Sequence, residues 1–246
     1  MKEIIKYLFV NMPTAHDFKG NSGLLKWSCI ILLMVTISIN IKAQNFNYSF
    51  AKDSISYEEL SGATVLSSGV NFSNKSFAIH FPFHFNFCGI NSDSLKIETN
   101  GFLVFDKTKQ LAIVAYNNFE SKKDTLGNYT SVISYNTSGA AGNRIIKIEF
   151  KNLAQNILCS SDFLNYQIWL YEAGNKVEIH TGANAQNGTA VLLGIINKNM
   201  DTSDKAYLIK GDTSSPSGEI ISGETSLDYL NQIPNSGIVY TLSPGF

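Results

Sequence analysis

Charged side chains are scarce in this sequence: Asp, Glu, Lys and Arg together make up 16% of its 246 residues. This scarcity disfavours a helical protein, because Glu, Lys and Arg are among the strongest helix formers. The chain also lacks a long helical period, an internal repeat and a proline-rich linker. Phe, Tyr, Gly, Ser and Asn are plentiful instead, a mixture that favours strands and turns. Apolar residues, at 44%, are ample for a packed core and argue against disorder.

The N-terminal segment has the pattern of an export signal. Lys26 precedes an apolar run from Trp27 to Ile39, and Ala43 follows as a small residue at the expected cleavage site. The run is short for a helix that spans a bilayer, although an uncleaved anchor is the alternative. We therefore predict an N-terminal extension and signal peptide at residues 1–43 and a single β-sandwich domain at 44–246. Export would place the domain in the periplasm, at the cell surface or outside the cell.

Cleavage changes the charge balance. Residues 1–43 hold five of the 19 basic and two of the 20 acidic side chains, so the remainder carries a net charge of −4. A mildly acidic surface does not attract nucleic acid or anionic lipid. We expect no nucleic-acid partner and, after cleavage, no membrane partner.

Few cysteines remain after cleavage. Cys88 and Cys159 form an even pair in a chain expected to meet an oxidising compartment, which favours a disulfide between them. The alternative is two separate thiols, each packed as a small apolar group.

The stretch 165–182 predicts a β-hairpin. Tyr166, Ile168 and Leu170 alternate with Gln167, Trp169 and Tyr171, so the two sets face opposite ways. Ala173, Gly174 and Asn175 break the run with residues that tolerate a left-handed backbone, and Val177, Ile179 and Thr181 resume the alternation.

The strongest alternation in the chain runs from Phe77 to Cys88. Bulky apolar side chains on one face of this strand indicate a deep core under a second sheet: Phe77, Ile79, Phe81, Phe83, Phe85 and Phe87. Pro82 cannot donate to a β-ladder, so we expect this strand at a sheet edge or bulged.

Further short strands follow at regular spacing. We expect them at 46–50, 64–66, 95–105, 112–116, 130–135, 144–153, 189–196, 206–209 and 238–242. Asn100-Gly101 marks either a tight hairpin turn or a bulge in one bent strand. The fold class predicted is all-β, an antiparallel two-sheet sandwich of jelly-roll or lectin-like form.

Four segments carry a resemblance to a known group of domains: IETNGFLVF at 97–105, SYNTSGAAGNRIIKIEFKN at 134–152, QIWLYEAGNKVEIH at 167–180 and PNSGIVYTLSP at 234–244. Over residues 46–244 the chain resembles exported, jelly-roll-like β-sandwich modules of gram-negative bacteria. Such modules often stand at the N-terminal end of large surface proteins, ahead of fibronectin-type or PKD-type repeats and a type IX secretion sorting domain. The resemblance implies a scaffold and no catalytic residues.

Catalytic signatures are missing. The chain contains no G-x-S-x-G elbow and no E-x-D-x-x-E pattern of jelly-roll glucanases. A glycosidase needs two carboxylates across a sugar bond, and the candidates Glu98, Glu149, Glu172 and Glu178 lie on strands or at a strand end, where charge usually marks the solvent face. We expect no enzyme activity and assign no catalytic residue.

Metal and ring motifs are weak. His80 and His84 are separated by about 13 Å along a strand, too far to share a zinc ion, so no metal site and no cofactor are expected. Asp201, Asp204 and Asp212 share a polar stretch but do not form a calcium loop, and solvated acids are the simpler interpretation. Tyr166, Trp169 and Tyr171 would stack a sugar only if one hairpin face were open, whereas core and edge packing is the commoner role.

The function expected is that of a secreted or cell-surface, non-catalytic module that binds a glycan or a surface protein, or has an envelope or adhesion role. Its ligand-binding residues are not identified by the sequence. The Asn-rich loops at 117–128, 136–143 and 197–205, or an open sheet face, are the places expected to carry recognition. The alternative is a carbohydrate-active hydrolase on a jelly-roll scaffold.

Overall fold

The computed structural model describes residues 47–106, 111–117, 119–155, 161–185, 190–197, 205–222 and 229–245. All of them belong to one compact unit of the chain, Gln44–Phe246. The expected N-terminal signal, residues 1–43, lies outside the described residues, so its cleavage stays a prediction.

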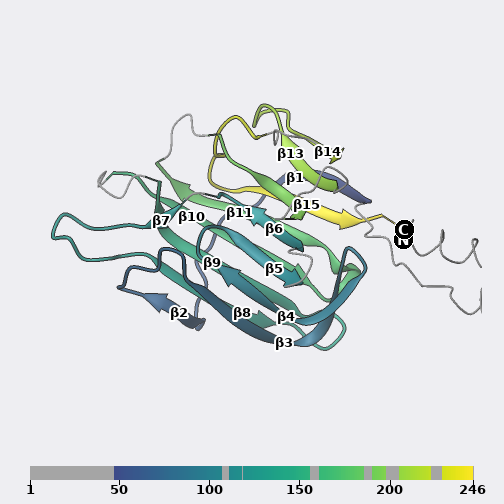
Figure 1. The fold of residues 1–246 in the computed structure, drawn as a ribbon, viewed down its shortest axis with the longest axis horizontal. Coiled ribbons are helices and arrows are strands. Elements are labelled where there is room, and N and C mark those ends of the chain that lie inside the picture. The colour runs from purple at the N-terminus through teal and green to yellow at the C-terminus, as the bar shows by residue number, and fades with distance from the viewer. Residues whose placement is uncertain are drawn as a thin grey trace, which may run out of the picture. The chain divides into compact units, whose positions relative to one another are not determined.

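The domain is all-β, with two antiparallel sheets that face each other across one core (Figure 1). The eight-stranded sheet has the order β1-β15-β11-β10-β9-β8-β2, with the short β7 paired to β9. Its strands are β1 (Tyr48–Ser54), β2 (Thr64–Ser68), β7 (Glu120–Ser121), β8 (Val132–Ser138), β9 (Ile145–Ala154), β10 (Leu164–Tyr171), β11 (Val177–Asn184) and β15 (Ile238–Pro244).

The seven-stranded sheet has the order β14-β13-β12-β6-β5-β4-β3. Its strands are β3 (Ser76–Phe87), β4 (Ile90–Glu98), β5 (Phe102–Asp106), β6 (Leu111–Ala115), β12 (Leu193–Asn197), β13 (Lys205–Lys210) and β14 (Ser217–Ser222). The predicted two-sheet sandwich is thus confirmed. Among the described residues, no helix is both long and apolar enough to cross a membrane.

The predicted hairpin forms the centre of the eight-stranded sheet. β10 pairs with β11 through the register Ile168↔Ile179, and both side chains are fully buried in the core. The turn between the strands is the short 3-10 element η2 (Ala173–Asn175). Gly174 has φ +73° and Asn175 has φ +51°, the left-handed conformations that the residue types predicted.

The aromatic strand is also confirmed. β3 alternates exposed and buried positions along its length, and from Ile79 to Phe87 every second side chain points into the core. It lies at the edge of its sheet, and its pairing with β4 shifts register between His80 and Phe85, the interval that contains Pro82. An edge position with a bulge is what a residue without an amide hydrogen requires.

Two details of the strand pattern needed the structure. Asn100-Gly101 is a hairpin turn between β4 and β5, with Gly101 at φ +93°, and not a bulge in one bent strand. β14 was not predicted, because its sequence SGEIIS gives a weak alternation signal and only Ile221 among its side chains is buried.

Candidate functional site

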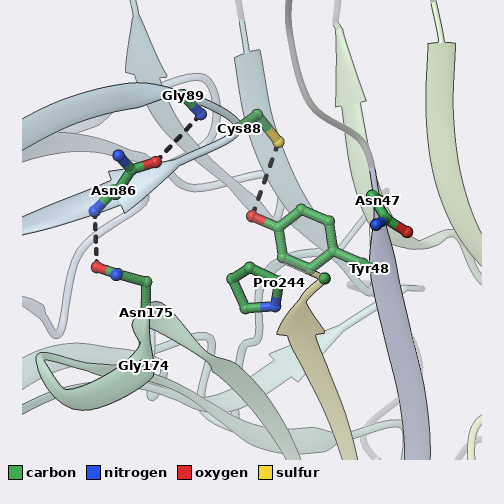
Figure 2. A pocket seen from close by; sticks show the side chains of 9 residues that line it. Asn47, Tyr48, Asn86, Cys88, Gly89, Gly174, Asn175 and Pro244 are labelled. Carbon is green, nitrogen blue, oxygen red and sulfur yellow. Dashed lines mark hydrogen bonds between the residues drawn. The ribbon is translucent and has the colours of Figure 1, made fainter.

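One cavity lies at the end of the sandwich where the β3–β4 turn approaches η2 (Figure 2). It measures about 290 Å³ and is lined by Asn47, Tyr48, Asn86, Cys88, Gly89, Gly174, Asn175, Pro244 and Gly245. The backbone N–H of Asn86 donates a hydrogen bond of 2.8 Å to Asn175 Oδ1 and so connects the two sheets at this end. Its lining contains no charged residue.

Cys88 belongs to this end pocket, is buried, and forms no disulfide with any residue that the structure describes. Its Sγ lies 3.8 Å from the Tyr48 hydroxyl, and burial raises the pKa of the thiol to about 12. A protonated, buried thiol is a poor nucleophile, so the pocket offers no reactive cysteine.

The predicted bridge partner, Cys159, lies outside the described residues, and the disulfide therefore stays a prediction. The described neighbours of the two cysteines are far apart in the topology. Cys88 lies beside η2, after the end of β10, whereas Ser161 precedes the start of β10. Eight residues of extended strand span about 25 Å. A bridge would require the loop that holds Cys159 to cross most of that distance.

A second set of polar side chains covers the outer face of the eight-stranded sheet. Pairing places Glu149, Gln167 and His180 in one row across β9, β10 and β11. The next row contains Lys147, Trp169 and Glu178, with Asn136 of β8 beside Lys147. These are the positions that alternate with the core residues, so they face away from the seven-stranded sheet.

Residues 55–61, here called the strap, lie over the first of these rows. Glu149 holds the strap: its carboxylate accepts hydrogen bonds from the Tyr57 hydroxyl at 3.0 Å and from the Leu60 amide at 3.2 Å. Gln167 Nε2 donates both to Glu149 Oε1 and to the Glu58 carbonyl, each at 2.8 Å. Glu149 is only 4% exposed. Sequence reasoning placed this glutamate on a solvent face, which is wrong because the strap covers it.

The strap needs a glycine beneath it. A Cβ at Gly182 would lie 2.8 Å from Cζ of Tyr57, closer than real Cβ contacts allow. Because Gly182 has no side chain, the Tyr57 ring can pack against its backbone, and the Tyr57 hydroxyl then reaches Glu149.

Trp169 stands between two neighbours on the outer face. The ring of His180 stacks on the indole with centroids 4.0 Å apart, and Lys147 Nζ lies 3.7 Å from the indole centroid. Because β11 and β9 flank β10 on opposite sides, the two groups approach the indole from opposite sides. Both faces of the indole are therefore occupied, which disfavours the sugar-stacking role considered for it. Tyr166, the second ring of that hypothesis, is fully buried in the core.

Glu178 is the other buried carboxylate of this face. It accepts hydrogen bonds from the Tyr171 hydroxyl at 2.5 Å and Lys176 Nζ at 2.7 Å, and its Oε2 lies 3.0 Å from His180 Nε2. Burial alone would raise its pKa, but these hydrogen bonds outweigh burial and lower the pKa to about 2. The expectation of a solvent-facing Glu178 is wrong, since its exposed fraction is 7%.

A cavity of about 410 Å³ opens between the strap and these rows. The strap supplies one wall, and the sheet contributes five side chains to the lining: Asn136, Lys147, Gln167, Trp169 and His180. Its volume is within the range of small-molecule sites. Since hydroxyl, amide and charged groups meet in it, we take this strap cavity as the candidate binding site.

The remaining candidates lie elsewhere. Glu98 pairs with Lys96 at 2.6 Å on the seven-stranded sheet, and Glu172 binds the Arg144 guanidinium at the β8–β9 turn. His80 and His84 are exposed on the edge strand β3. In the part of the chain that the structure describes, no group of three or more His, Cys, Asp or Glu residues could hold a metal ion.

Of the acids weighed for calcium, Asp201 and Asp204 lie outside the described residues. Asp212 accepts hydrogen bonds from the Ser214 amide at 2.7 Å and from Asn231 Nδ2 at 3.1 Å. The ammonium of Lys52 donates to the carbonyls of Thr213 and Ser214 beside it. A lysine thus occupies carbonyl oxygens that a calcium ion would need.

Sequence reasoning missed the strap, Lys147 and Asn136 as parts of one site. The strap sequence ISYEELS reads as a polar turn, and no local pattern shows which face a turn covers. The one signal in the sequence was Gly182, an outward-facing glycine within a strand, which indicates that another segment approaches the backbone closely there.

Comparison with curated proteins and with solved structures finds no match. A family model described as NIDO related matches residues 47–244, nearly all of the sandwich. The range agrees with the segment over which the sequence resembles exported β-sandwich modules. The protein belongs to the NIDO-related family.

Proposed function

We propose that this protein is a secreted or cell-surface, non-catalytic recognition module, which binds a glycan or a protein in the strap cavity. The observation that carries the proposal is the cavity itself, about 410 Å³ between a hydrogen-bonded strap and the outer face of a rigid sheet. The signal-like segment at 1–43 and the resemblance to exported surface modules support a location outside the cytoplasm.

The state of the carboxylates supports binding over hydrolysis. Glu149 and Glu178, the two buried acids of the outer face, each have several hydrogen bonds within the chain. With its pKa near 2, Glu178 stays ionised at neutral pH and cannot serve as a general acid. Glu149 is committed to holding the strap.

Binding and turnover can be tested together. The purified exported protein is screened against a panel of immobilised polysaccharides and of chromogenic glycosides. We expect retention on at least one polysaccharide and turnover of no glycoside. A Ser56→Trp variant, which places a large side chain at an exposed position of the cavity wall, should lose binding. Thr125→Trp, on an exposed turn outside the cavity, is the matched control and should keep it.

Two results would contradict the proposal. Turnover that disappears when Glu98, Glu149, Glu172 or Glu178 is changed singly would establish the hydrolase alternative. Binding that survives Ser56→Trp would move recognition away from the strap cavity.

A further inference from the structure

Lys147 is the lysine that lines the strap cavity, and no acid among the described residues pairs with it. The other lysines of this face are paired, Lys151 with Glu59 and Lys176 with Glu178. Lys147 makes a contact with the Trp169 ring and no ion pair with any carboxylate that the structure describes. The indole fixes the position of the ammonium group, while the donors that point away from the ring stay available.

Among the described residues, the buried acids around the cavity are bonded to other donors and none forms an ion pair with Lys147. Glu149 is saturated by donors from the strap and Gln167, and Glu178 is saturated by Tyr171, Lys176 and His180. Glu58 is exposed on the strap, the wall opposite the sheet that holds Lys147. A ligand with one anionic end is therefore oriented, with its anion against the sheet wall.

Asn136 provides a polar group next to Lys147. Its Nδ2 donates a long hydrogen bond of 3.5 Å to the Ser61 carbonyl, and its Oδ1 is buried with no hydrogen-bond partner in the described part of the chain. The last side-chain torsion of an asparagine rotates easily. Such a rotation would turn the Asn136 side-chain amide toward the cavity and break only the long hydrogen bond to Ser61. An incoming hydroxyl would satisfy the oxygen that is now unpaired.

The strap offers little to an extended peptide. Its Leu60 amide and Glu58 carbonyl are already bonded to the sheet side chains below, so the strap presents no continuous ladder for another backbone. Recognition in this cavity depends on side-chain hydroxyl, amide and ammonium groups, which suit sugar hydroxyls and a carboxylate.

We propose that the strap cavity binds an acidic glycan through a uronic acid residue, with Lys147 on the sugar carboxylate and Asn136 on a neighbouring hydroxyl. This inference rests on the proposed function and names the ligand class of the same cavity. Because an ammonium–carboxylate contact in a half-open site is screened by ions, binding should weaken as salt rises.

The experiment is calorimetric titration of the full exported protein with oligosaccharides of galacturonate, alginate and hyaluronan, and with their carboxyl-reduced, neutral counterparts. We expect binding of at least one acidic oligosaccharide and a loss of about tenfold or more on carboxyl reduction. Lys147→Met, which keeps a long unbranched side chain and removes the charge, should cause a similar loss for the acidic form alone. Lys147→Arg should retain most of the affinity, and the exposed Lys75→Met serves as the charge-matched control.

The outcomes separate the two proposals. Equal binding of acidic and neutral forms, unchanged in Lys147→Met, would overturn the acidic-glycan inference and leave the recognition function in place. Binding of no oligosaccharide, or of acidic peptides only, would overturn the inference and leave a protein ligand for the module. Thermal unfolding of each variant checks that a loss of affinity is not a loss of fold.

Discussion

At the scale of single residues, the outer face of the eight-stranded sheet depends on buried carboxylates with several donors each. Glu149 joins the strap to the sheet, and Glu178 joins Tyr171, Lys176 and His180. A buried acid is stable only when its charge is well hydrogen-bonded. Both glutamates therefore hold neighbouring groups of this face in place.

The charge of Glu178 makes a prediction about acid stability. Its pKa falls from an ordinary 4.5 to about 2 in the folded protein, so the native state favours the ionised form. The stability that it contributes is present above pH 4.5 and is lost as the pH falls toward about 2. We expect Glu178→Gln to be less stable than wild type at pH 7 and to lose less stability on acidification.

Urea unfolding at pH 7, 4.5 and 3 measures this effect. Glu219→Gln removes an exposed partner of Lys210 and serves as the control, with wild-type pH dependence expected. Parallel profiles of unfolding free energy against pH for Glu178→Gln and wild type would show that the Glu178 carboxylate contributes no pH-dependent stability.

At the scale of elements, β3 contributes aromatic side chains to the core, and β10 contributes Gln167 and Trp169 to the strap cavity. Along β3, Phe85 and Phe87 are fully buried, and Phe81 and Phe83 are buried with a small exposed fraction. Phe81 and Phe83 have ring centroids 5.2 Å apart, and the Arg144 guanidinium of the facing sheet lies 5.5 Å from the Phe83 ring. This edge strand therefore packs several aromatic rings into the core beside its pairing with β4.

We therefore predict that Phe83→Ala lowers the free energy of unfolding by roughly 3–5 kcal/mol, through lost burial and the cavity left behind. His84→Ala, at the next residue on the exposed face, should change it by about 0.5 kcal/mol or less. Chemical denaturation of both variants provides the comparison. Similar small losses for the two would mean that this end of β3 does not pack in the core.

At the scale of the whole chain, the prediction concerns export. A basic residue, the apolar run from Trp27 to Ile39 and the small residue Ala43 are typical of a cleaved signal, and we expect the exported protein to begin close to residue 44. Intact-mass measurement of protein recovered from the cell exterior checks the cleavage. A mass that still includes Trp27 would indicate a membrane-anchored protein instead.

The sequence by itself determined most of the strands, the hairpin turn and the inward-facing set of β3. These features are local: a period of two places alternate residues on opposite faces, and Gly174-Asn175 supplies the left-handed turn wherever the strands lie. It could also predict that Pro82 lies at a sheet edge or at a bulge, because a missing amide hydrogen is a property of the residue itself.

Only the tertiary structure decided what covers the outward-facing set. Tyr57 and Glu149 are 92 positions apart in sequence, yet the hydrogen bond between them is one of those that hold the strap over the sheet. Alternation distinguishes one face of a strand from the other, but both faces can be buried when a distant segment crosses the outer one. Glu149 was expected in solvent for that reason, whereas Glu178 is buried beside its partners Tyr171, Lys176 and His180. The cavity beside Lys147 exists only because residues 55–61 return across β9 and β10.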